Sequence, residues 1–252
     1  MYSKIVVLAI IGIGCWLFYN SEPHLLEEEK PKMEHATAAI RPSLCIYFAQ
    51  DATGSDTVNG VEIVHSDIFN PIFNCVDRNI ELYYGIIRGN SAVKPICLKL
   101  AAFAFERPLL PATNQRTITE RNVESEEYAE TLKGYQSDSG EYYSRRKENI
   151  RVFISQIEER LRYTASTYAS STDIYSVLVI AKKIFNASLA GTKNILILNS
   201  DGKDTQYKHI PDLHLPADVY LTNAGNGTVT SLDSMITNTF SSPEKAIEIS
   251  LQ

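Results

Sequence analysis

Short apolar runs separated by polar loops recur along the chain and predict five β-strands. The runs at 43–50 and 194–199 are apolar on consecutive positions, a pattern typical of strands that are covered on both faces, as in a parallel sheet. The run at 217–222 predicts a further strand of this kind. The runs at 82–89 and 95–103 are joined by the short turn NSAVK, which predicts a hairpin.

Apolar positions at three- and four-residue steps predict helices at 68–80, 145–163, 172–189 and 232–240. Residues 106–142 are polar and rich in Thr, Glu, Ser and Tyr, and they predict an inserted surface loop. Strands that alternate with helices are typical of an α/β protein. We therefore expect a Rossmann-like, open and mostly parallel sheet with helices on both faces.

The N-terminal part differs from this domain. Residues 5–19 carry no charge and follow a short start that contains Lys4, a pattern typical of a signal segment. We interpret residues 1–20 as a membrane-anchor helix or signal peptide, 21–42 as a polar linker, and 43–252 as the folded domain. The acid-rich residues after the apolar run favour an orientation with the domain outside the cytoplasm, in the periplasm or on the cell surface.

Cleavage of this segment is a separate question. No small-residue cleavage site directly follows the apolar run, which favours an uncleaved anchor. Cys15 follows Gly-Ile-Gly and faintly resembles the lipidated cysteine of a lipoprotein, which is the alternative. In both cases the sequence predicts a protein tethered to a membrane.

Charge and cysteine content narrow the classes of function. The 252 residues carry a formal net charge of −6, which argues against a nucleic-acid partner because phosphate binding needs clustered Lys and Arg. Cys45, Cys75 and Cys97 lie in apolar contexts without CxxC spacing. We interpret them as buried thiols, with one disulfide as the alternative in an oxidising compartment.

Oxygen-bearing side chains cluster at the ends of two predicted strands and at the start of a helix. Because ligands of open α/β sheets bind at the carboxyl ends of the strands, these clusters predict a binding site. All the contacting atoms are oxygens, which favours a hard cation, Mg²⁺ or else Mn²⁺ or Ca²⁺. Two carboxylates and three hydroxyls would leave room for one outside ligand; the five candidates are Asp51, Thr53, Ser55, Thr172 and Asp201.

Three motifs resemble those of von Willebrand factor type A (vWA) domains. DATGSD resembles the family's DxSxS or DxTGS signature, SSTDIYSVLVIAKKIF is similar to its threonine-bearing loop and following helix, and NILILNSDG is similar to its strand ending in S/T-D-G. They occur in the family's order over about residues 43–240.

The resemblance implies a vWA fold with a metal-ion-dependent adhesion site. Its ligands would be the same five residues, with Thr53 where serine is more usual. Members of the family mostly serve in protein–protein recognition. The resemblance therefore implies a protein partner whose Asp or Glu carboxylate completes the coordination of the metal.

Two other functions fit part of this pattern. DATGS also resembles the DKTGT of aspartyl-phosphate-forming phosphatases, in which Asp51 would be the nucleophile and Asp201 a magnesium ligand. That interpretation leaves Thr172 unexplained. The other alternative is a vWA scaffold with a degenerate site that binds no metal, where these oxygens only cap helices and fill turns, as Thr172 would as an N-cap. We expect a binding module rather than an enzyme.

Overall fold

The computed structural model describes residues 41–52, 64–89, 93–109, 118–165, 171–206, 210, 213–223, 232 and 234–252. The chain divides into two units, residues 1–39 and 40–252, and the described residues belong to the second. The anchor, the lipidation candidate Cys15 and all but the last two residues of the linker thus lie outside them. Of the helices in the described ranges, none combines the length and the apolar character needed to cross a membrane.

A six-stranded sheet in the order β3-β2-β1-β4-β5-β6 forms the centre of the domain. All neighbouring strands are parallel except β2 and β3, which form the predicted antiparallel hairpin. The prediction of a mostly parallel sheet is therefore confirmed. The strands are β1 (Leu44–Asp51), β2 (Ile80–Ile87), β3 (Ile96–Leu100), β4 (Lys193–Asn199), β5 (Asp218–Thr222) and β6 (Asn238–Phe240).

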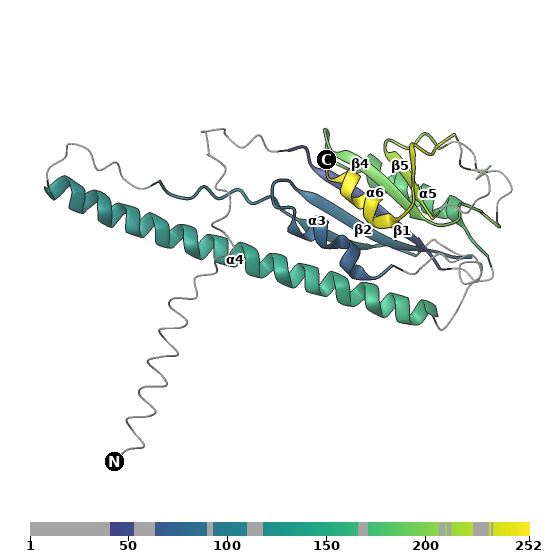
Figure 1. Ribbon diagram of the computed structural model, residues 1–252, viewed down its shortest axis with the longest axis horizontal. Helices are drawn as coiled ribbons and strands as arrows, with labels where there is room; N and C mark the ends of the chain where they lie inside the picture. Colours follow the sequence, from purple (N-terminus) through teal and green to yellow (C-terminus); the bar gives the residue numbers. More distant parts are fainter. Residues whose placement is uncertain are drawn as a thin grey trace, which may run out of the picture. The chain divides into compact units, whose positions relative to one another are not determined.

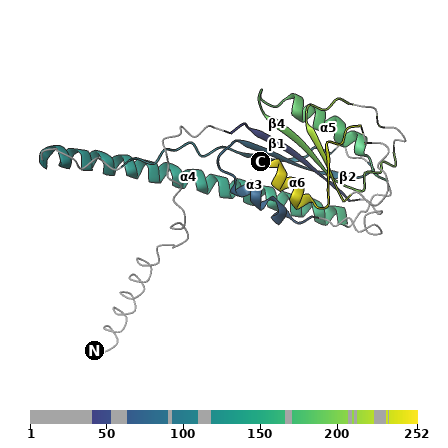
Figure 2. The ribbon, with the colours of Figure 1, turned by 45° about the horizontal axis from the view of Figure 1, so that its top comes forward.

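Helices cover both faces of this sheet, as predicted for an α/β protein (Figure 1). One face carries α5, and the other carries η2, α3, α4 and α6 (Figure 2). All residues of β1 are buried, and its side chains alternate between the two cores. The helices are η2 (Ser66–Phe69), α3 (Asn70–Asn74), α4 (Ile118–Ala165), α5 (Ile174–Asn186) and α6 (Pro243–Ser250).

The prediction of a surface loop over 106–142 is wrong for residues 118–142, which form the first half of α4. This stretch has no proline and contains many Glu residues, which are good helix formers. Its half-buried residues Tyr128, Leu132 and Tyr135 lie at helical spacing and extend the stripe of the helix predicted at 145–163. The polarity of the segment reflects the exposure of this helix rather than a loop.

Two other predicted helices are corrected. The helix predicted at 68–80 is shorter in the structure: it ends at Asn74, and Ile80 begins β2. The segment predicted as helix at 232–240 instead ends in β6, which pairs in parallel with β5. In such short segments, apolar residues three or four positions apart do not distinguish a helix from a turn followed by a strand, and here pairing with β5 decides the outcome.

The three described cysteines are free thiols. Cys45 is buried, and burial raises the pKa of its thiol to about 11, so that it stays protonated at neutral pH. Cys75 is half-buried and its thiol donates to Asp77 Oδ1 at 3.1 Å, whereas Cys97 is exposed. The prediction of buried thiols is therefore confirmed for Cys45 and wrong for Cys97.

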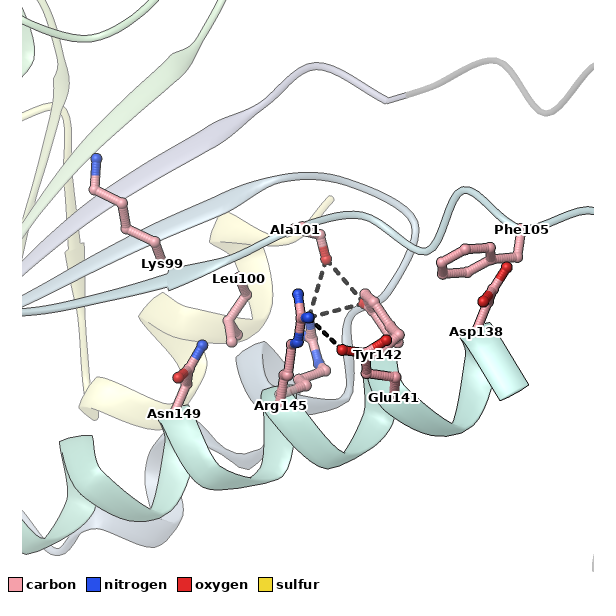
Figure 3. A pocket seen from close by; sticks show the side chains of 10 residues that line it. Lys99, Leu100, Ala101, Phe105, Asp138, Glu141, Tyr142, Arg145 and Asn149 are labelled. Carbon is pink, nitrogen blue, oxygen red and sulfur yellow. Dashed lines mark hydrogen bonds and ion pairs between the residues drawn. The ribbon is translucent and has the colours of Figure 1, made fainter. Parts of the chain in front are cut away.

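A buried arginine ties α4 to the rest of the domain. The Arg146 guanidinium donates to three backbone carbonyl oxygens: Phe73 O at 3.1 Å, Cys75 O at 2.5 Å and Ala101 O at 3.2 Å. Tyr142, one turn earlier on α4, donates its hydroxyl to the same Ala101 oxygen at 2.8 Å (Figure 3). One guanidinium group therefore satisfies backbone carbonyl oxygens both at the end of α3 and in the segment after β3.

We predict that Arg146→Met lowers the free energy of unfolding by roughly 2–4 kcal/mol, because buried carbonyl oxygens lose their donor while the apolar stem is kept. Urea denaturation followed by circular dichroism measures the change. Arg145→Met is the matched control, since Arg145 is exposed and pairs with the exposed Glu141; its effect should stay within about 0.5 kcal/mol. Equal effects of the two substitutions would contradict an anchoring role of Arg146.

Candidate functional site

Buried polar side chains gather where β1, β4 and β5 end. Because these strands are parallel neighbours, their carboxyl ends meet at one edge of the sheet, which we call the carboxyl edge. Burial of polar groups is costly unless they are hydrogen-bonded, so such a cluster needs an internal network. Five of these residues have no exposed surface: Gln50, Asp51, Asn199, Ser200 and Thr222.

Asn199 is the centre of this network. Its Nδ2 donates to Gln50 Oε1 at 2.8 Å, and its Oδ1 accepts from Thr222 Oγ1 at 2.8 Å and from Asn223 Nδ2 at 2.6 Å. Gln50 in turn donates its Nε2 to the backbone oxygen of Asp51 at 2.7 Å. Gln50, Asn199 and Thr222 occupy paired positions on neighbouring strands, so the side-chain network runs across the sheet in line with its register.

Asp51, the last residue of β1, is held from the neighbouring strand end. Ser200 Oγ donates to Asp51 Oδ2 at 2.6 Å and accepts from the backbone N–H of Gly202 at 3.1 Å. Gly202 has φ near 78°, in the left-handed region, which lets the chain turn sharply after β4. Ser200 belongs to the motif SDG, but the motif by itself does not indicate its contact with Asp51.

Thr172, which precedes α5, is joined to the loop after β4. Its backbone N–H donates to Thr205 Oγ1 at 2.7 Å, and its carbonyl oxygen accepts from the backbone N–H of Thr205 at 3.1 Å. The side chain of Thr172 is buried, with 2% of its surface exposed. The loop at 200–206 therefore contacts both Asp51, through Ser200, and Thr172, through Thr205.

The start of α5 is capped by aspartates and not by Thr172, which corrects that part of the degenerate-site alternative. Asp173 is the N-cap, and its carboxylate accepts from the backbone N–H of Ser176. Asp204 Oδ2 accepts from the backbone N–H groups of Ile174 and Tyr175 at 2.9 and 3.0 Å. The two carboxylates together accept from the backbone N–H groups of the first turn of the helix. Their negative charge also interacts favourably with the positive end of the helix dipole.

Asp201 lies in the loop at 200–206, with 6% of its surface exposed. Its Oδ1 accepts from the backbone N–H of Lys203 at 3.0 Å, and its Oδ2 lies 3.5 Å from the Lys203 ammonium. The Lys203 side chain is 65% exposed.

The structure therefore brings three of the five predicted ligands, Asp51, Thr172 and Asp201, to the same edge of the sheet around the loop at 200–206. Thr53 and Ser55 lie outside the described residues. Within the described ranges no three His, Cys, Asp or Glu side chains form a metal-binding group. The predicted ligand set contains two carboxylates and three hydroxyls, so it would not form such a group even if it binds a metal. The metal site therefore remains a prediction.

Two clefts lie elsewhere in the described part of the domain. One, of about 460 Å³, lies between α4 and the segment 99–105, with Lys99, Phe105 and Tyr142 at its wall (Figure 3). The other, of about 700 Å³, lies where β2 and β3 meet the C-terminal turns of α4. Neither is lined by the three predicted ligands.

Comparisons of the sequence with models of known protein families and with curated proteins gave no match. The resemblance to vWA domains accordingly rests on the three sequence motifs.

Asn199→Ala should lower the free energy of unfolding by roughly 2–4 kcal/mol, because it removes three hydrogen bonds at the strand ends, to Gln50, Thr222 and Asn223. Asn194→Ala in the same strand is the control; it loses one exposed hydrogen bond, to Pro216 O, and should cost about 1 kcal/mol or less. Chemical denaturation of both variants provides the comparison. If Asn199→Ala were no more destabilising than Asn194→Ala, the network would not hold the strand ends.

Proposed function

We propose that the protein is a membrane-tethered, vWA-like binding module that holds a protein partner at its carboxyl edge, outside the cytoplasm. The observation that carries the proposal is the position of the predicted ligands. Asp51, Thr172 and Asp201 are 0, 2 and 6% exposed at one edge, in a domain whose other buried side chains are mostly apolar. Buried oxygen clusters at strand ends are typical of binding sites rather than of packing.

The strand order supports this location. The chain passes from β1 to β2 on one side and later returns to pair β4 with β1 on the other side. The connections thus change direction between β1 and β4, and ligands of open α/β sheets bind in the crevice outside the carboxyl ends at such a switch point. Asp51 ends β1, and Ser200-Asp201 follow β4.

The donor set fits a divalent cation. Asp51, Thr53, Ser55, Thr172 and Asp201 would hold Mg²⁺ through oxygen atoms, the ligands that this ion prefers. When bound, the ion would supply an open coordination position for a carboxylate oxygen of the partner. The Lys203 ammonium beside Asp201 is on a largely exposed side chain, so it can turn into solvent when a cation binds.

One observation supports a second candidate, a Mg²⁺-dependent aspartyl-phosphate-forming phosphohydrolase. The Lys203 ammonium, 3.5 Å from Asp201 Oδ2, is a cation of the kind that stabilises a phosphoryl group. In that case Asp51 would be the nucleophile. The binding module accounts for one more residue, Thr172, and is therefore our first choice.

We expect the full-length protein, purified in detergent, to bind one Mg²⁺ or Mn²⁺ per chain in isothermal titration calorimetry. Asp51→Asn and Asp201→Asn should each abolish this binding, because each removes an anionic ligand at nearly constant shape. Asp218→Asn is the matched control, since Asp218 starts β5 at the opposite edge of the sheet, and it should bind like the parent.

Circular dichroism of the variants checks that they are folded. Folded Asp51→Asn and Asp201→Asn proteins that both bind metal with parental affinity would refute the assignment of the site. Absence of metal binding by the parent would instead support the degenerate scaffold.

The binding module and the phosphohydrolase differ in the role of Asp51. For a binding module we expect no covalent aspartyl-phosphate and no tight binding of beryllium fluoride, a phosphoryl mimic that phosphohydrolases bind in Mg²⁺. A partner captured from membrane extracts in Mg²⁺ should be released by EDTA and lost with Thr172→Ala. Thr131→Ala, which removes a hydroxyl on exposed α4, should retain it.

Mass spectrometry of Asp51-containing peptides after incubation with small phosphate esters provides the direct measurement. A phosphorylated Asp51 would establish the phosphohydrolase. A partner retained in EDTA would make the metal irrelevant to binding.

A further inference from the structure

The larger of the two clefts carries a local excess of positive charge. It is lined by Arg88 after β2, Lys94 before β3 and Arg160 on α4, with Glu159 as its one acidic residue. The chain as a whole has a net charge of −6, so this concentration of cations is opposite in sign to the rest of the molecule. We call this region, with Val93 and Tyr163, the basic cleft.

Two of the three cations are fixed by contacts within the cleft. Arg160 Nη1 donates to the backbone oxygen of Lys94 at 3.1 Å, which joins α4 to the start of β3. The Arg88 guanidinium lies 5.7 Å from the centre of the Tyr163 ring, in cation–π contact with α4. Because these cations are already held in place, less side-chain entropy is lost when an anion binds to them.

Apolar surface lies beside these charges. Val93 is 50% exposed and Tyr163 is 62% exposed, the latter in the last turns of α4. Placed beside the cations, these two side chains offer apolar contacts to a ligand that also carries charge. The basic cleft is therefore suited to a ligand that combines carboxylates with apolar side chains.

The basic cleft borders the carboxyl edge. Asp51 pairs with Ile87 in the sheet, and the backbone N–H of Ala52 donates to Ile87 O at 3.2 Å. Arg88 is the next residue of that strand end. Gly89 follows and packs so closely on Ser171, beside Thr172, that a Cβ at Gly89 would lie 2.4 Å from Ser171 Oγ. A ligand on the carboxyl edge could thus extend into the cleft without leaving the surface.

We propose that the basic cleft binds an acidic peptide segment, with interspersed apolar residues, of the same protein partner that the carboxyl edge binds. This inference rests on the proposed function for the identity of the partner. Charge complementarity selects the occupant: three cations outweigh Glu159, and apolar side chains flank them. A nucleic acid fits less well, because the surrounding net charge of −6 repels a polyanion.

The test uses a fluorescein-labelled octapeptide of alternating Glu and Leu, with a matched octapeptide in which Gln replaces each Glu. Fluorescence anisotropy should show that the full-length protein in detergent binds the Glu peptide. It should bind the Gln peptide at least tenfold more weakly, because the Gln peptide lacks the charges that contact the cations of the cleft. Raising the NaCl concentration from about 0.05 M to about 0.5 M should weaken binding, since exposed charges are screened.

Lys94→Glu should weaken binding of the Glu peptide by about tenfold, and Arg88→Gln by a smaller factor. Lys133→Glu is the matched control, because Lys133 is exposed on α4 outside the cleft, and it should leave the affinity unchanged. No binding of the Glu peptide, or parental affinity in folded Lys94→Glu and Arg88→Gln proteins, would overturn the proposal.

Two further outcomes separate the alternatives. Sedimentation of the protein alone at low salt that showed a dimer, dispersed by Lys94→Glu, would identify a second copy as the occupant and refute a separate partner. Loss of metal binding in Asp51→Asn with peptide binding intact would support the cleft independently of the metal. Peptide binding that persists while the parent binds no metal would refute the proposed metal site and leave the cleft supported.

Discussion

The amide of Asn199 is the contact on which the candidate site depends. It bridges the ends of three parallel strands by donating to Gln50 and accepting from Thr222 and Asn223. At the end of a parallel sheet the backbone ladder stops, so side chains must hold the strand ends together. Because Gln50, Asn199 and Thr222 are fully buried, the bonds between them are stronger than at the surface, and an unpaired member would be costly.

The position of the loop at 200–206 depends on that network. It leaves β4 directly after Asn199, contacts Asp51 through Ser200, and contacts the start of α5 through Thr205 and Asp204. Asp204 satisfies backbone N–H groups that the first turn of a helix would otherwise leave without partners. The loop therefore connects the sheet core to the helix on one face; it contains Asp201 and contacts Asp51 and Thr172.

Helix α4 packs on the face of the sheet opposite to α5. Arg146 holds it through three carbonyl oxygens near its middle, while Phe153 and Ile157 enter the core and Arg160 reaches the basic cleft. A charge can be buried there only because several acceptors surround it. Since the same helix lines both clefts, its attachment positions one wall of each.

The sequence by itself determined the strands β1 to β5, the mostly parallel α/β class and the helix α5, because consecutive apolar runs and helical spacing reflect burial. It also identified Asp51, Thr172 and Asp201 as polar groups at strand and helix ends. Only the tertiary structure decided that residues 118–142 are helical, that β6 pairs with β5, and that Gln50, Asn199, Ser200 and Asp204 support the site. The pairing of β6 and these supporting hydrogen bonds depend on contacts between residues distant in sequence, such as Gln50 and Asn199, which are 149 positions apart, and local patterns carry no signal for such contacts. The helix at 118–142 is exposed, so its polar composition obscures the narrow stripe formed by Tyr128, Leu132 and Tyr135.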